Sequence, residues 1–119
     1  MSTLDGYERQ AQLLRALSHP VRLRILDILA CCHEACVCHL GAILNRPQPY
    51  VSQQLATLRE AGLVSDRRER TLMYYHLADE RITAWLDQYK GLLREEEELA
   101  FPPVPEGALP NCPCPHCQE

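Results

Sequence analysis

The sequence predicts a mainly α-helical fold with one small β-hairpin. Two helix patterns lie close together between residues 34 and 62, joined by a tight Asn-Arg-Pro connection. Gly62 then supplies a left-handed helix stop, and residues 63–77 alternate strand, charged turn and strand. A helix pair followed by a basic hairpin is the order of elements in a winged helix-turn-helix, which is the architecture we expect.

The first element is an amphipathic helix over residues 7–17, with Tyr7, Leu14 and Leu17 near one face. A chain of 119 residues suits one domain with a modest core. Small domains of this size often gain stability by dimerising, so we expect this apolar face to pack against a second copy and the protein to be a homodimer.

The second helix begins after a cap from Ser18 or His19, with Pro20 in its first turn, where a missing N–H costs nothing. Its core stripe contains Ile25, Ile28, Leu29 and Cys32. A buried structural thiol is therefore the preferred interpretation of Cys32, whereas Cys31 lies off the stripe and receives no role.

The second helix of the pair places Val51, Leu55 and Leu58 at i, i+4 and i+7, which predicts a buried stripe. The opposite face is polar but uncharged, and its amide and hydroxyl groups are suited to base edges in a major groove. An ordinary solvated face is the alternative. We expect five residues to approach bases or adjacent phosphates: Gln48, Tyr50, Ser52, Gln53 and Thr57.

The hairpin that follows carries Arg67, Arg68 and Arg70 around its tip. By themselves these arginines could be a solvated turn. Beside the helix pair they predict phosphate contacts along double-stranded DNA, because cations on a wing neutralise the backbone while the helix reads bases.

Two cysteines, Cys36 and Cys38, open the first helix of the pair. In an ideal helix their side chains point about 200° apart, so an undistorted helix cannot direct both at one ion. Either the first turn is already unwound around Cys36, or an ion pulls it out of shape; we favour the second, since strain in this helix should lower DNA affinity. Two small apolar fillers are the alternative.

The composition changes abruptly after residue 100. Residues 101–119 hold six of the nine prolines, which predicts an extended, mobile arm attached to a domain of residues 1–100. The arm carries Cys112, Cys114 and Cys117, with His116 between them. Extended chain from Ala100 could bring Cys112 about 40 Å, at roughly 3.3 Å per residue, to Cys36 and Cys38 of either subunit. The arm could equally close a site of its own, or its cysteines could be incidental.

Four segments in order, ALSHPVRLRILDIL, CVCHL, PYVSQQLATLREAGLV and RRERTLMYYHL, resemble the arsenic- and zinc-responsive repressor family (ArsR/SmtB) over roughly residues 10–100. The resemblance implies a homodimeric winged-helix repressor that releases operator DNA when a metal or metalloid ion binds. Relatives with a CVC pair at this place are similar to sensors of arsenite, antimonite, cadmium and lead, and zinc also accepts thiolates.

The sequence departs from these relatives at several places. Arsenite sensors often carry a third cysteine where this chain has Gly41, and cadmium sensors borrow cysteines from an N-terminal arm that has none here. The histidines of the zinc site would fall at Arg81 and Leu92. Relatives usually place glycine at the wing tip, where Arg70 would make a positive φ costly, so we expect a turn of another type.

Other features limit the class of protein. No apolar run approaches the roughly 20 residues needed to span a bilayer, and no export signal is visible, so we expect no membrane partner and a soluble, cytoplasmic protein with reduced thiols. The net charge of -4 divides into +2 for residues 1–76 and -6 for residues 77–119, which leaves the DNA-facing part basic.

Two other uses of the cysteines remain open at this stage. They could form a redox or sulfide switch in a repressor of the same fold, with no metal. An enzyme is disfavoured, because no CxxC opens a helix after a strand; Cys114 and Cys117 form a CxxC only within the proline-rich arm.

Overall fold

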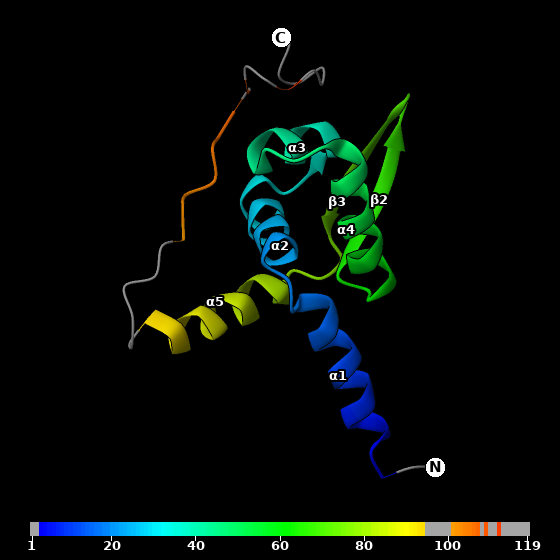
Figure 1. Cartoon of the computed structure of the whole chain (residues 1–119), viewed down its shortest axis with the longest axis vertical. Coiled ribbons are helices and arrows are strands. Elements are labelled where there is room, and N and C mark those ends of the chain that lie inside the picture. The colour runs from blue at the N-terminus through cyan, green and yellow to red at the C-terminus, as the bar shows by residue number, and fades with distance from the viewer. Residues whose placement is uncertain (1–2, 95–100, 108, 110–111, 113–119) are drawn as a thin grey trace.

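The computed structural model describes residues 3–94, 101–107, 109 and 112. Figure 1 shows the helices gathered around α2, with a small sheet on one side. The elements in order are α1 (Asp5–Leu17), α2 (Pro20–Cys32), β1 (Ala35–Cys36), α3 (Val37–Leu44), α4 (Gln48–Glu60), β2 (Val64–Glu69), β3 (Leu72–Leu77) and α5 (Arg81–Arg94). The predicted mainly α-helical, winged helix-turn-helix fold is confirmed, and β1 is an additional strand that the sequence did not predict.

The core is built around α2. Ile25, Ile28 and Leu29 are buried, as their spacing predicted, and they meet the buried stripe of α4 at Val51, Leu55 and Leu58. Cys32 is half-buried at the edge of this core rather than inside it, and Cys31 is exposed.

The helix ends follow from the residues that lie there. His19 caps α2 by accepting the Val21 N–H on its Nδ1 atom at 3.2 Å, with Pro20 as the first helical residue. Asn45 ends α3 in the left-handed conformation, and Gly62, with φ of +80°, follows α4 as expected. The stop at Asn45 separates α3 from α4, and the stop at Gly62 separates α4 from β2.

The sheet is antiparallel, with strand order β1-β3-β2. In the β2–β3 hairpin Glu69 pairs with Leu72, so Arg70 and Thr71 form a two-residue turn. Arg70 adopts φ of 58°, and our expectation that it would avoid positive φ was wrong. Two-residue hairpin turns need positive φ to match the right-handed twist of the strands, and this requirement outweighs the preference of arginine.

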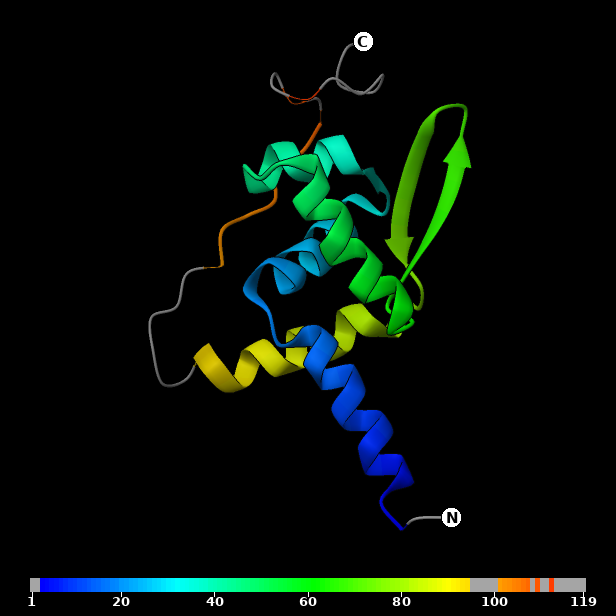
Figure 2. The ribbon, with the colours of Figure 1, turned by 45° about the vertical axis from the view of Figure 1, so that its right-hand side comes forward.

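One apolar face has no cover within the described part of the chain. Figure 2 shows α1 projecting away from the body beside α5. Leu14, Trp85, Tyr89 and Leu93 are exposed on this face, Tyr89 to 52%. A groove of about 650 Å³ lies here between α1, α2 and α5. Among the described helices, none is long and apolar enough to cross a membrane.

Candidate metal centre and nucleic-acid interface

Cys36 occupies the junction between β1 and α3. Its backbone is extended, with φ of -83° and ψ of 165°, and its Sγ atom caps α3 by accepting the His39 N–H at 3.4 Å. Helix α3 therefore begins at Val37, after the first cysteine. The mechanism that we favoured from sequence, in which an ion unwinds the first turn, was wrong: the turn is already open, and both thiols converge without helix distortion.

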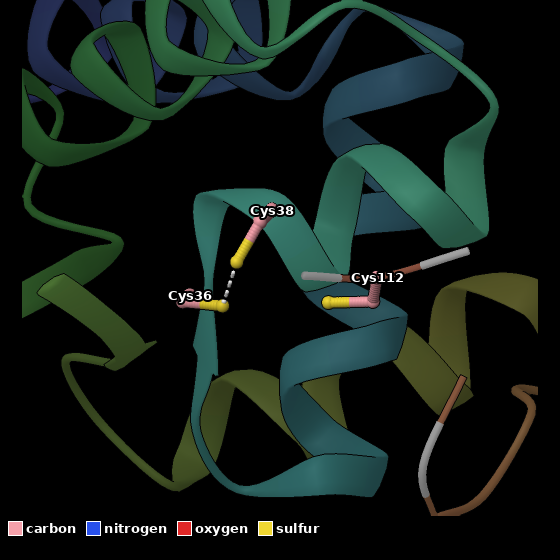
Figure 3. A group of neighbouring side chains, drawn as sticks. All are labelled: Cys36, Cys38 and Cys112. Carbon is pink, nitrogen blue, oxygen red and sulfur yellow. Dashed lines mark hydrogen bonds between the residues drawn. The ribbon is translucent and has the colours of Figure 1, made fainter. Parts of the chain in front are cut away.

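Three sulfur atoms come together at this junction. The Sγ atoms of Cys36, Cys38 and Cys112 all lie within 4.8 Å of one another, and those of Cys36 and Cys38 are 2.6 Å apart (Figure 3). Two sulfurs bonded to one zinc ion lie at most about 4.6 Å apart, which is twice a bond of about 2.3 Å. Three sulfurs around one such ion lie about 3.7 to 4.0 Å apart, so the Cys36 and Cys38 sulfurs must open by about 1 Å, and Cys112, within 4.8 Å of both, needs to approach by about 1 Å at most.

The three cysteines are buried in a small apolar cluster distinct from the main core. Tyr74 of β3 is buried with them, and Ala42, Leu72 and Leu109 pack around them. The register of the sheet places Cys36 directly opposite Tyr74. The sulfur cluster is therefore built onto the wing sheet, out of contact with bulk water.

Cys112 reaches this cluster along an anchored path within its own chain. Pro102 and Pro103 accept hydrogen bonds from the guanidinium of Arg24, and Val104 packs against the core. Figure 2 shows this segment crossing from the end of α5 toward α3. The described part of the arm thus lies against the body, whereas Cys114, His116 and Cys117 lie outside the described residues.

Helix α4 presents most of its predicted DNA-facing residues to solvent. Gln48, Ser52 and Gln53 are exposed. Tyr50 differs from the prediction, because it is half-buried and its side chain packs against the core. Thr57 is half-buried too, and its hydroxyl donates to the Gln53 carbonyl at 3.3 Å. Three amide and hydroxyl side chains consequently form the open part of this face.

The three wing arginines divide into two kinds. Arg68 and Arg70 are exposed beside the hairpin turn. Arg67 instead donates to both carboxylate oxygens of Glu34, at 2.7 and 2.5 Å, and its guanidinium lies 4.8 Å from the centre of the Tyr74 ring. Hydrogen bonding to Glu34 raises the pKa of Arg67 above its already high value. Arg67 therefore joins the wing to the residue before β1.

Sequence reasoning missed Glu34 and Tyr74. Glu34 carries no motif of its own, and its partner lies 33 positions away. Tyr74 fits the strand pattern of an ordinary hairpin. Its place beside the thiols follows only from the pairing of β1 with β3, and a strand of two residues leaves no periodic signal.

Comparison with known proteins places the chain among regulators. Residues 19–66 match the family model described as bacterial regulatory protein, arsR family. An uncharacterized HTH-type transcriptional regulator, MJ1325 of Methanocaldococcus jannaschii, is 38% identical over 66% of this chain and 89% of its own. Arsenic resistance transcriptional regulator ArsR1 of Pseudomonas putida is 36% identical, over 76% of this chain and 70% of its own.

The fold has matching solved structures. The homodimeric winged helix-turn-helix domain Mb0332 of Mycobacterium bovis, described as a possible ArsR-family regulator, superposes with a TM-score of 0.72 at 27% identity. The match covers 87% of this chain and 97% of that domain. The helices and the wing thus belong to an architecture shared with that domain.

Proposed function

The chain belongs to the arsR family of bacterial regulatory proteins, whose members are transcriptional regulators rather than enzymes, and we propose that it is a homodimeric repressor released from its operator by a thiophilic ion. The observation that carries the proposal is the convergence of three buried thiols, Cys36, Cys38 and Cys112, on the wing sheet. The protein acts in the cytoplasm, where its thiols stay reduced.

The chemistry of the donors selects the class of ion. All three ligand atoms in the cluster are sulfur, and thiolates favour soft ions over magnesium or calcium. Arsenite, antimonite, cadmium, lead and zinc all meet this requirement. Cys114 and Cys117 are proposed as further ligands, either to the same ion or in a second site.

DNA contact is proposed for two surfaces. The exposed Gln48, Ser52 and Gln53 of α4 approach base edges in the major groove, with Tyr50 and Thr57 at the margin of that face. Arg68 and Arg70 contact phosphates. Arg67, which pairs with Glu34, instead stabilises the wing.

The ion is coupled to DNA through the wing in this proposal. Cys36 is paired with Tyr74 across β1 and β3, and Tyr74 lies beneath the guanidinium of Arg67. Drawing the three sulfurs onto one ion moves β1 against β3 and shifts the wing relative to α4. The ion releases DNA only if it binds the protein with the shifted wing more tightly than the protein with the DNA-binding wing position. A ligand shifts an equilibrium only by its differential affinity for the two states.

A second copy is proposed to cover the apolar face of α1 and α5. The groove there is lined by Leu14, Trp85 and Tyr89 among others, and Tyr89 is exposed. An exposed apolar surface of this kind on a small domain marks an interface. Two copies place two α4 helices on one DNA duplex, which suits an operator with two half-sites.

Direct ion binding tests the proposal. We expect the reduced protein to bind cadmium or arsenite with three thiolates per subunit, seen as thiolate-to-ion charge-transfer absorption. Cys36→Ser, Cys38→Ser and Cys112→Ser should each weaken binding at least tenfold, whereas Cys31→Ser, at an exposed thiol outside the cluster, should not. Undiminished binding by the three cluster variants would remove the site.

A redox switch is a second candidate, favoured by the close approach of the Cys36 and Cys38 sulfurs. A peroxide or diamide would accept two electrons and two protons from the two thiols as a disulfide forms. Release of DNA by such an oxidant in the presence of a metal chelator, reversed by a thiol reductant, would support this version. Release by ions in the presence of excess reductant would support the ion sensor.

A further inference from the structure

Arg24, on the exposed side of α2, holds two successive backbone carbonyls of the C-terminal arm. Its Nη1 atom donates to the Pro102 oxygen at 2.6 Å and its Nη2 atom to the Pro103 oxygen at 3.2 Å. These partners lie 78 and 79 positions away in the chain. The contact therefore fixes the arm at a point between α5 and Cys112.

Neighbouring contacts hold the same stretch of the arm. The ammonium of Lys90, paired with Asp27 at 2.5 Å, lies 5.0 Å from the centre of the Phe101 ring. Val104 packs on the main core, just beyond the prolines. Farther along, Leu109 packs in the sulfur cluster, and its carbonyl accepts the Cys112 N–H at 3.2 Å.

The chemistry of the contact suits arginine and proline. Two guanidinium N–H groups point in nearly the same direction, so they bind a pair of adjacent acceptors, whereas a lysine ammonium acts as a point charge. The proline rings fix φ, which stiffens this stretch and restricts the directions of the two carbonyls that accept from Arg24. Arg24 thus binds the backbone of the arm and needs no charged side chain on the arm itself.

We propose that Arg24 is the positioning residue that places Cys112, the third thiolate, against Cys36 and Cys38 of the same subunit. The inference rests on the proposed function, since it concerns how that ion site is assembled. Arg24 lies on a different element from the three sulfurs of the cluster and is not itself a ligand. By holding the arm, Arg24 places the Cys112 thiol close to its ligand position before an ion binds.

The size of the effect follows from loop closure. With the clamp in place, the tether to Cys112 begins at Pro103; if its loss also frees Phe101 and Val104, whose contacts flank the clamp, the tether begins at Arg94, the last described residue of α5, twice as far along the chain. Doubling a flexible loop raises the closure cost by about 0.6 kcal/mol, which corresponds to about a threefold change in affinity. Ordering of the freed arm adds to this, so we expect a loss of between about threefold and tenfold.

The first experiment needs no ion. Cys112 is 1% exposed, so its alkylation by iodoacetamide should be slow in the reduced full chain. Arg24→Ala should raise the rate at Cys112 severalfold, measured by mass spectrometry of the peptide that contains it, and Arg24→Lys should give an intermediate rate. Arg9→Ala, which removes an exposed arginine from α1, is the charge-matched control and should leave the rate unchanged. An unchanged rate in Arg24→Ala would overturn the proposal.

The second experiment measures arsenite affinity in a double-mutant cycle. Arg24→Ala should weaken binding about threefold to tenfold in the full chain and have no effect in a Cys112→Ser background. An equal loss in both backgrounds would show that Arg24 acts on the whole fold, which would overturn its positioning role. If the unaltered protein binds neither arsenite nor cadmium, the proposed ion-sensing function is wrong. The alkylation experiment still decides whether Arg24 holds Cys112.

Discussion

The backbone conformations of two single residues, Cys36 and Arg70, shape the sulfur cluster and the tip of the wing. Cys36 is extended and Val37 is helical, so a helix start divides the CVC pair and lets both thiols face the same point. At the wing tip, Arg70 holds a left-handed conformation that costs an L-residue about 1 kcal/mol or more. The first arrangement brings together two thiols of the proposed ion site, and the second exposes a cation that we propose contacts DNA.

Replacing the strained arginine separates its two effects. Arg70→Gly should stabilise the protein by up to about 1 kcal/mol, because glycine adopts positive φ without strain. It should also remove one phosphate contact, which lowers the slope of log affinity against log salt by about 1. Chemical denaturation and operator binding at several salt concentrations measure the two effects. A less stable variant with an unchanged salt slope would contradict both assignments.

Asp79 gives the start of α5 a pH dependence. Hydrogen bonds from the Arg81 side chain and backbone lower the pKa of Asp79 from 3.8 to about 2. Because the folded-state pKa is depressed, the carboxylate stabilises the fold above pH 3.8, and this contribution is lost as pH falls toward 2. A carboxyl NMR titration should find the low pKa in the protein and a higher one in Arg81→Ala, where only the backbone hydrogen bond remains. A pKa near 3.8 in the unaltered protein would contradict the contact.

At the scale of elements, the wing is the proposed connection between the sulfur cluster and DNA. β1 lies beside β3, so Cys36 and Tyr74 share one sheet, and Arg67 of β2 reaches back to Glu34 at the entrance of β1. The ion pair is part-exposed, so its own contribution to stability is small. Its importance lies in joining two elements that an ion would move together.

Arg67 and Arg68 form a matched pair for testing this connection, since they are adjacent on β2. Arg68→Ala should weaken operator binding and lower the salt slope by about 1, while the ion still releases DNA as strongly as before. Arg67→Ala should leave ion binding intact but reduce the ratio of operator affinities without and with ion at least threefold. Operator binding and ion binding are measured on the same preparations. The same ion response in both variants would exclude the proposed route.

The sequence predicted the elements better than the contacts between them. Periodicity was enough for α2, α4 and the hairpin, because each repeats its signal over two or more turns or several alternations. It could not reveal β1, which is two residues long, or the break that it makes before α3. The bonds from Arg24 to the arm were also invisible, since backbone carbonyls carry no residue-specific signal.

At the scale of the whole molecule, the fold places three proposed functions on three sides. The open face of α4 and the wing tip are available to DNA, the sulfur cluster lies between the wing and α3, and the apolar face of α1 and α5 remains for a second copy. The described part of the arm contacts α2 at Arg24 and links the edge of that apolar face with the proposed ion site, since Phe101 lines the groove and Cys112 joins the sulfurs.

The dimer is tested on that apolar face. Tyr89→Asp should shift the protein toward monomer by placing a charge in the interface, with little effect on the fold of each subunit because Tyr89 is about half exposed. Gln88→Asp, an exposed neighbour on the same helix, is the control and should remain dimeric. Sedimentation analysis distinguishes the two states. A dimeric Tyr89→Asp protein would place the interface elsewhere.

The most direct measurement of the central claim is binding of the reduced protein to its own promoter DNA by fluorescence anisotropy, without and with arsenite or cadmium. The unaltered chain and Cys31→Ser should bind DNA and release it when the ion is added. Cys36→Ser, Cys38→Ser and Cys112→Ser should bind DNA equally well and hold it at the same ion concentration. If the Cys36 and Cys38 variants still release DNA on addition of the ion, these thiols are not the sensor.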